Sequence, residues 1–199
     1  LYNEKTIAKN FISINKIFSN TSSPIPASDE PHIFEKIKFD LPSKYIFEGK
    51  ELDLKDGLAH FHTDGLIILH DGKMLFEEYW NGNSPDSKHI SFSVAKSYLS
   101  ALFGIAVDEG LIDSIDDSVS KYLEDFIGTG YEDVKIKNLL QMSSGIAFNE
   151  DYADPNSDIN KFSRATARDV PFRDFAKTLK NGREQGTYNH YVSLDTQVL

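Results

Sequence analysis

A serine and a lysine stand three residues apart at the start of an apolar segment, as Ser93 and Lys96. Residues at positions i and i+3 lie on the same face of a helix, so the Ser93 hydroxyl and the Lys96 amine can meet if the segment is helical. A serine hydroxyl becomes a good nucleophile only when a neighbouring base takes its proton, and a poorly solvated lysine can be that base. The pair therefore has the chemistry to attack a carbonyl carbon and form a covalent intermediate.

The surroundings of this pair favour a buried helix. Lys96 carries the only charge between residues 93 and 107. Apolar residues recur there at helical spacing, at Val94, Ala95, Tyr98, Leu99, Leu102, Ile105 and Ala106. So many apolar positions predict burial on most sides. A lysine in such a helix must reach solvent, find a counter-charge or lose its proton, and the free N–H groups at the helix start can stabilise an oxyanion.

The same spacing occurs twice more, at residues 13 and 16 and at residues 118 and 121, as a short motif does by chance. Both of those pairs lie in polar segments, and only Ser93 opens a long apolar helix. A second interpretation is that Ser93 caps the helix while the Lys96 side chain extends to solvent. The local residues leave the nucleophile and the cap equally open.

Composition excludes several classes of protein. A net charge of −10 argues against binding to nucleic acid or to an anionic membrane surface. No apolar run approaches the roughly 18–20 residues needed to cross a bilayer. The chain has no cysteine, which excludes disulfides, thiol catalysis and Cys-ligated zinc. His60 and His62 lack a third metal ligand at a recognisable spacing, so we expect a strand with solvent-facing histidines there and no metal site.

The order of the expected elements indicates an α+β (mixed α/β) fold, because strands come first and helices follow without alternation. Asp71-Gly72 between two β-prone runs predicts a hairpin with a type I′ turn over residues 66–80. The other expected elements are a helix at 7–18, a linker at 19–28, the Ser93 helix closed by Gly110, a helix at 131–141, a loop at 149–163, a helix starting at Pro171 and a helix start at 192–199.

We divide the chain into an N-terminal extension and linker (residues 1–45), a first part of a sheet domain with the Ser93 helix (46–112), and a mostly helical subdomain (113–199). The chain begins with Leu rather than Met, and it ends in a helical pattern without a stop signal. We therefore expect it to be the N-terminal part of a longer protein.

Six blocks of the sequence together resemble one known superfamily. They are the hairpin and residues 93–97, 107–113, 139–145, 149–155 and 191–193, in this order. The chain is similar to the serine β-lactamases and penicillin-binding proteins, in their class C-like esterase and amidase branch, and most similar to the 6-aminohexanoate-dimer hydrolases. The resemblance covers residues 65–199. It implies an antiparallel sheet flanked by helices, with a mostly helical subdomain and with the C-terminal strands of the sheet missing from this chain.

The resemblance also implies roles for individual residues. Ser93 corresponds to the acylated nucleophile, Lys96 to the group that takes its proton, and Tyr191 to the catalytic tyrosine. Ser193 stands where many relatives have Asn, and we expect it to assist by hydrogen bonding. Tyr152 corresponds to a loop tyrosine that contacts the substrate. Taken without the resemblance, Tyr191 reads as a core aromatic and Tyr152 as a locally packed loop residue. Ser163 departs from the pattern, because the dimer hydrolases have an aspartate there.

The activity implied is that of a metal-independent serine hydrolase that cleaves a small ester or amide through an acyl-enzyme, without a cofactor. The alternative is a catalytically slow or silent penicillin-binding-like sensor. The expected partners are the small-molecule substrate and a C-terminal remainder or second chain that supplies the missing strands. Relatives with such N-terminal extensions are often exported, so we expect a periplasmic or otherwise exported protein, with the cytoplasm left open.

Overall fold

The computed structural model describes residues 2–17, 26 and 28–199. The chain forms two compact units, Leu1–Ser91 and Phe92–Leu199, which are described separately. This grouping does not test the expected division at residues 45 and 112, which stays a prediction. The helix expected at 7–18 is two short helices, α1 (Ile7–Phe11) and α2 (Ile14–Ile17). Most of the linker expected at 19–28 lies outside the described residues.

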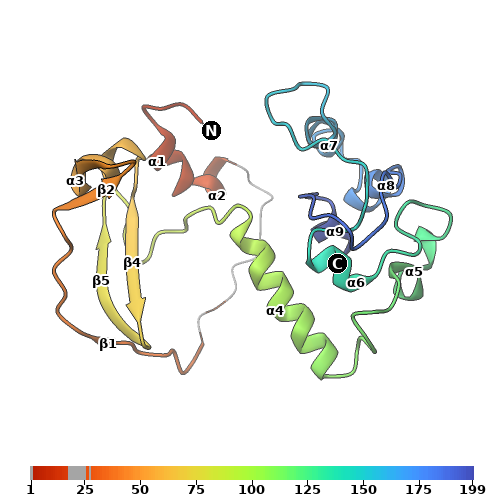
Figure 1. Cartoon of the computed structure of the whole chain (residues 1–199), viewed down its shortest axis with the longest axis horizontal. Helices are drawn as coiled ribbons and strands as arrows, with labels where there is room; N and C mark the ends of the chain where they lie inside the picture. Colours follow the sequence, from red (N-terminus) through yellow and green to blue (C-terminus); the bar gives the residue numbers. More distant parts are fainter. Residues whose placement is uncertain (1, 18–25, 27) are drawn as a thin grey trace. The chain divides into compact units, whose positions relative to one another are not determined.

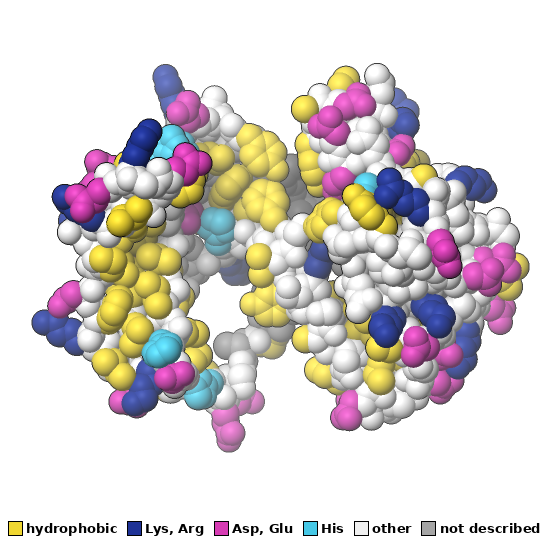
Figure 2. Space-filling model, viewed as in Figure 1, with side chains coloured by type: hydrophobic (Ala, Val, Ile, Leu, Met, Phe, Trp, Pro, Cys, Tyr) yellow, Lys and Arg dark blue, Asp and Glu magenta, His cyan; other side chains and the backbone are white. Residues whose placement is uncertain are grey.

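The first unit contains two small sheets (Figure 1). In the larger sheet the strand order is β1 (Glu35–Lys36), β5 (Lys73–Tyr79) and β4 (Gly65–His70), with β1 parallel to β5 and β4 antiparallel to it. The smaller sheet pairs β2 (Lys44–Phe47) with β3 (Lys50–Asp53). Hydrophobic side chains gather on the surface over β4 and β5 (Figure 2), where Ile67 and Leu69 are exposed.

The hairpin of the first unit confirms the sequence prediction. Strands β4 and β5 are joined by Asp71 and Gly72, whose φ angles are 48° and 73°. Positive φ at both central positions defines the type I′ turn, which matches the right-handed twist of the two strands.

The strand expected around the two histidines is wrong. His60 is the last residue of helix α3 (Leu54–His60), and His62 follows with a φ of 52°. The helix forms because the Asp53 carboxylate accepts hydrogen bonds from Lys55 N and Asp56 N, at 2.8 and 3.1 Å, and so caps its first turn. Among the described residues, no group of three or more His, Cys, Asp or Glu side chains is placed to hold a metal ion.

The second unit is helical. Its elements are α4 (Val94–Asp108), α5 (Val119–Tyr122), the 3-10 helix η1 (Glu124–Phe126), α6 (Ile136–Leu140), α7 (Asp158–Thr166), α8 (Phe172–Lys177) and α9 (Asp195–Val198). The end of α4 near Gly110, the start of α8 after Pro171 and the helix near the last residue confirm the sequence predictions. Within the described residues, no helix is long and apolar enough to cross a membrane.

The loop expected at residues 149–163 ends earlier, because α7 begins at Asp158. The Ser157 hydroxyl accepts a hydrogen bond from Asn160 N at 3.4 Å, which caps the helix. Ile159 is buried against the core on one side of α7. The polar composition concealed this short helix, since only a few apolar residues attach it to the unit.

Among the described residues, every buried hydrophobic side chain lies in the second unit, between residues 119 and 198. Its largest fully buried side chains are Tyr131, Phe126, Leu139 and Leu194. The rings of Phe126 and Tyr131 meet edge to face, with their centres 5.9 Å apart. The connection that follows α6 and the segment 190–198 both contribute to this core, so it holds two stretches that are far apart in the sequence.

The burial predicted for the Ser93 helix is wrong for the part of the chain that the structure describes. No residue of α4 is buried, and Val94, Tyr98, Leu102 and Ile105 are 53–70% exposed. The predicted helix is correct. The spacing of apolar residues shows which face of a helix can be buried, but burial also requires another segment that packs on that face.

Candidate active site

Ser93 occupies the N-cap position of α4 without using its side chain as a cap. Its φ and ψ are −71° and −6°, and its hydroxyl makes no capping hydrogen bond. The hydroxyl instead accepts a hydrogen bond from the Tyr191 hydroxyl at 2.7 Å, across 98 positions of sequence. The contact that the capping interpretation requires is therefore absent, and Ser93 Oγ lies beside a phenol.

Lys96 lies one turn further along α4 and is half-buried. Its Nζ lies 5.6 Å from the centre of the Tyr191 ring, within the range of a cation–π contact. Among the described residues, no hydrogen bond joins Lys96 Nζ to Ser93 Oγ, so Tyr191 is the group that contacts both. The structure brings together the three residues that the sequence assigned to catalysis.

The position of Tyr191 follows from the packing of its neighbours. Val192 and Leu194 are completely buried, whereas Tyr191 is exposed and Ser193 half-buried. His190 anchors the same segment, because its backbone N–H donates to Met142 O at 2.7 Å and its Nε2 donates to Phe148 O at 2.8 Å. Burial of alternate side chains therefore turns Tyr191 and Ser193 away from the core.

The two residues expected to bind substrate meet at Glu150. Ser193 donates to the Glu150 carboxylate from its backbone N–H, at 3.0 Å, and from its hydroxyl, at 2.5 Å. The Tyr152 hydroxyl donates to the same carboxylate at 2.9 Å. Partial burial and the nearby Glu150 charge raise the pKa of the Tyr152 phenol. Ser163 lies on α7, where its hydroxyl donates to Ile159 O at 2.9 Å, and no interaction joins it to these residues.

A buried carboxyl group lies two residues beyond Ser193. Asp195 is fully buried, and the Tyr131 hydroxyl donates to its Oδ1 at 3.0 Å. Burial raises the pKa of Asp195 to about 7, against the opposing effects of the Ser144 and Tyr131 hydroxyls and of the positive charge on Lys96. Burial also raises the pKa of Tyr131.

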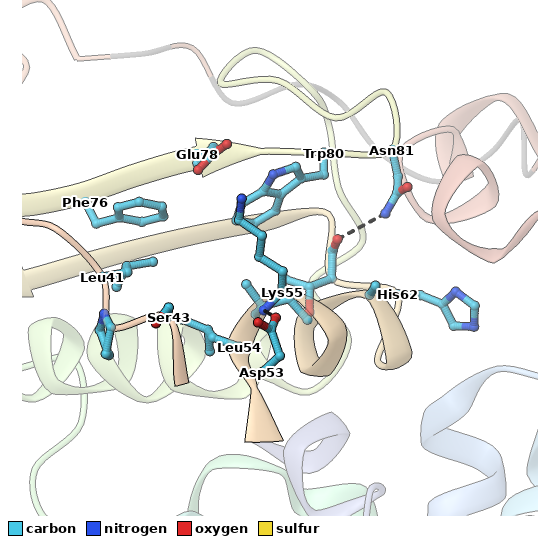
Figure 3. Close-up of a pocket in the computed structure, with 14 residues that line it drawn as sticks. Leu41, Ser43, Asp53, Leu54, Lys55, His62, Phe76, Glu78, Trp80 and Asn81 are labelled. Carbon is cyan, nitrogen blue, oxygen red and sulfur yellow. Dashed lines mark hydrogen bonds between the residues drawn. The ribbon is translucent and has the colours of Figure 1, made fainter. Parts of the chain in front are cut away.

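A separate cavity of about 760 Å³ lies in the first unit (Figure 3). Leu41 and residues of α3 line it, together with Phe76 from β5 and Trp80, which follows that strand. Asn81 donates to Thr63 O at 3.0 Å at its edge. None of the residues singled out in the sequence for catalysis or substrate binding lines this cavity.

A model of one known family matches most of the chain. The family model described as Beta-lactamase matches residues 54–199. The chain therefore belongs to the β-lactamase family, as its sequence motifs indicated, and the expected α+β fold of this family is confirmed.

Within the family, the chain is similar to 6-aminohexanoate-dimer hydrolase of Paenarthrobacter ureafaciens, with 33% identity over 154 residues. The match covers 74% of the chain and 39% of that relative, so the chain spans well under half of the relative's length. A solved structure described as a candidate 6-aminohexanoate-dimer hydrolase from Bacillus anthracis shares the fold, with a TM-score of 0.81 and 18% identity over 98% of this chain and 54% of the other. A candidate β-lactamase from Bacteroides dorei gives a TM-score of 0.54 and 21% identity, over 73% of this chain and 42% of the other.

Sequence reasoning missed Glu150 and Asp195. Glu150 lies in a polar loop with two other acidic residues, Asp151 and Asp154, and composition does not show which carboxylate faces inward. Asp195 follows Leu194 in a helical pattern where acidic residues are common at the first turn. The available signal was that Asp195 is the only Asp, Glu, Lys or Arg between residues 185 and 199.

Proposed function

We propose that the whole protein is a metal-independent serine hydrolase that cleaves an ester or amide through an acyl-enzyme. The observation that carries this proposal is the hydrogen bond between Tyr191 OH and Ser93 Oγ at the start of α4, with Lys96 Nζ against the same tyrosine ring. Membership of the β-lactamase family and the similarity to a named hydrolase support it.

In the proposed reaction Lys96, acting with Tyr191, removes the Ser93 proton as Ser93 Oγ attacks the carbonyl carbon. The Ser93 N–H lies at the start of a 15-residue helix and has no acceptor among the described residues, so it can donate to the oxyanion. As the bond to the leaving group breaks, Tyr191 donates a proton to the departing oxygen or nitrogen. Water then attacks the acyl-enzyme, which releases the acid and returns the proton to Ser93.

Small esters are the first substrates to test, with amides or short oligomers of amino acids second. Tyr152 and Ser193 are proposed to contact the substrate, because both lie in the segments that carry the site. Ser163 stands where the resemblance places an aspartate of the dimer hydrolases, and their amide substrate is therefore the weaker choice.

The proposal is tested on the whole protein with a fluorophosphonate probe, peptide mass spectrometry and turnover of p-nitrophenyl acetate. We expect label on the Ser93 peptide and steady turnover, both lost in Ser93→Ala, with turnover falling by about 10³-fold or more. Ser118→Ala is a matched control, because Ser118 has the same spacing to Lys121 but lies in a polar segment. Lys121 there pairs with Asp113 and Asp117, at 2.6 and 2.8 Å.

The outcomes separate the proposed hydrolase from other functions. Label on Ser93 without turnover would favour the penicillin-binding-like sensor. Absence of label on Ser93, in protein that is folded, would overturn the nucleophile assignment.

We also propose that further polypeptide, either more of the same protein or a second chain, covers α4. The support is the exposed apolar face of this helix, since large apolar patches on proteins are usually covered by another surface. We expect the active species to have a mass well above 22.5 kDa or to contain a second chain. An active, folded species with an intact mass of 22.5 kDa would contradict this proposal.

A further inference from the structure

Glu150 is the group that joins the two sides of the proposed substrate site. Its Oε1 accepts hydrogen bonds from Ser193 Oγ and from Tyr152 OH, and its Oε2 accepts one from Ser193 N. Three donors therefore converge on one half-buried carboxylate. Hydrogen bonds to a charged acceptor are about twice as strong as those between neutral groups.

The backbone around Glu150 is fixed on both sides, so its direction is built into the loop. Asn149 N donates to Asp158 Oδ2 at 2.9 Å, and Ile159 N donates to Asn149 O at 3.1 Å. Asn160 Nδ2 donates to Tyr152 O at 3.1 Å. The first turn of α7 therefore holds the residues before and after Glu150, and α7 itself packs on the core through Ile159.

Glu150 has a hydrogen-bond partner on each side of the substrate site, Ser193 on one side and Tyr152 on the other. Ser193 is separated from Tyr191 only by Val192, which is completely buried and cannot rotate freely. The buried Val192 fixes the backbone between them, so loss of the Glu150 hydrogen bonds frees the Ser193 side chain while Tyr191 keeps its contact with Ser93 Oγ. On the other side, the Tyr152 hydroxyl donates to Glu150 and also interacts with the Ser193 side chain. Loss of Glu150 would therefore remove the charged acceptor that holds this exposed tyrosine.

We propose that Glu150 is a positioning residue that holds Tyr152 and Ser193 in the geometry required for substrate binding. This inference rests on the proposed hydrolase function and names the residue that organises its substrate side. Among the described residues no hydrogen bond or ion pair joins Glu150 to Ser93 or Lys96, so its main effect is on substrate affinity. Gln in its place keeps the size of the side chain, but it replaces the charged carboxylate with a neutral amide that has only one acceptor oxygen for the three donors.

The first test compares Glu150→Gln with Asp151→Asn in the whole protein. We expect Glu150→Gln to raise KM for the ester substrate about 10-fold and to change kcat less than threefold. Asp151→Asn removes the same charge from the next residue, while an Asn Oδ1 can still accept the hydrogen bond from Ala153 N that Asp151 Oδ1 accepts at 2.8 Å. We expect its KM to stay within twofold of that of the unmodified protein.

A second test uses pairwise variants, because residues in one hydrogen-bond network act non-additively. Tyr152→Phe should raise KM by itself, and adding Glu150→Gln to it should raise KM by clearly less than the product of the two single effects. A conservative Glu150→Asp variant shortens the reach of the carboxylate and should fall between Glu150→Gln and the unmodified protein. These variants keep the proposal testable if Glu150→Gln does not fold.

Labelling of Ser93 by the fluorophosphonate distinguishes failure of this inference from failure of the proposed function. If Ser93 labels in the unmodified protein but Glu150→Gln changes KM less than twofold, or no more than Asp151→Asn does, Glu150 is not a positioning residue. If the effects of Tyr152→Phe and Glu150→Gln on KM multiply in the double variant, Glu150 does not act through Tyr152, and the proposal is overturned. If Ser93 does not label in the unmodified, folded protein, the hydrolase proposal itself fails.

Discussion

Helix α4 and the region from residue 119 to residue 198 belong to the same unit but differ in how far their apolar residues are buried. α4 is the longest described helix, it is apolar over most of its length, and none of its residues is buried. The region that follows consists of short helices and turns, yet it contains every buried hydrophobic residue of the described chain. Length and apolar composition therefore did not decide which of the two forms the core.

The contrast divides the candidate site into two halves. Tyr191 and Ser193 are held by side chains buried on either side of them, so the packing of the core sets their direction. Ser93 and Lys96 lie on α4, which has no buried residue. Among the described residues, their side chains are held by the contacts with Tyr191. Segments with few buried contacts open more easily than a core does. The geometry of the nucleophile is therefore held less firmly than that of Tyr191.

The largest expected effect is the loss of stability when a ring is removed from the core. A small loss would contradict the difference in burial between the core and α4. Phe126→Ala removes a buried ring that packs edge to face on Tyr131 and should lower the free energy of unfolding by about 3–5 kcal/mol. Ile127→Ala, one residue along and 61% exposed, is the matched control and should cost less than about 1 kcal/mol. Urea unfolding followed by circular dichroism measures both.

Equal losses at the two positions would contradict this prediction. They would mean that Ile127 is covered in the whole protein as well as Phe126 is, and that the core extends beyond the residues assigned to it here.

The second effect is a dependence of the free energy of unfolding on pH, which arises from the carboxyl group of Asp195 buried in the core. Because the pKa of Asp195 is raised from 3.8 to about 7, the folded protein binds this proton more tightly than the unfolded chain does. The contribution of Asp195 to the free energy of unfolding is therefore greatest at low pH. It falls as the pH rises from about 4 to about 7, by up to about 4 kcal/mol.

Asp195→Asn should abolish this fall, because the amide stays neutral while its Oδ1 can still accept the hydrogen bond from Tyr131. The free energy of unfolding is measured from pH 5 to pH 8, with the exposed Asp133→Asn as control. If the variant and the unmodified protein lose stability in parallel over this range, Asp195 does not keep its proton in the folded state.

Much of the fold could be predicted where a local rule decides the structure. Asp71-Gly72 specifies its turn by the φ angles that these two residues tolerate, and Pro171 fixes a helix start for the same kind of reason. The failures involve features that depend on distant residues. The burial of α4 depends on a covering segment, and the helix at Asp158 depends on a core contact made by Ile159.

The site shows the same division. Ser93 and Lys96 could be found from their spacing, and Tyr191 from the resemblance to a family. The hydrogen bond between Ser93 and Tyr191 spans 98 positions, and no local pattern encodes it. Glu150 was missed because a loop with several carboxylates does not reveal in its sequence which one accepts hydrogen bonds from the rest of the site.

The smallest effect compares the two serines that begin helices in these regions. Ser157 caps α7 through Asn160 N and is almost fully buried, whereas Ser93 stands at the same position of α4 without a capping bond. Ser157→Ala should lower the free energy of unfolding by about 1 kcal/mol. Ser93→Ala should cost clearly less stability than Ser157→Ala while abolishing turnover, and thermal unfolding of the two variants beside esterase assays measures this.

The opposite ranking would be the informative failure. If Ser93→Ala destabilised the protein as much as Ser157→Ala, the Ser93 hydroxyl would stabilise the fold through a contact other than that with Tyr191, and the capping interpretation would return. If the ranking holds, the two serines show how one residue type at one helix position serves two purposes. Burial commits Ser157 to the fold, and the exposed start of α4 leaves the Ser93 hydroxyl available to Tyr191.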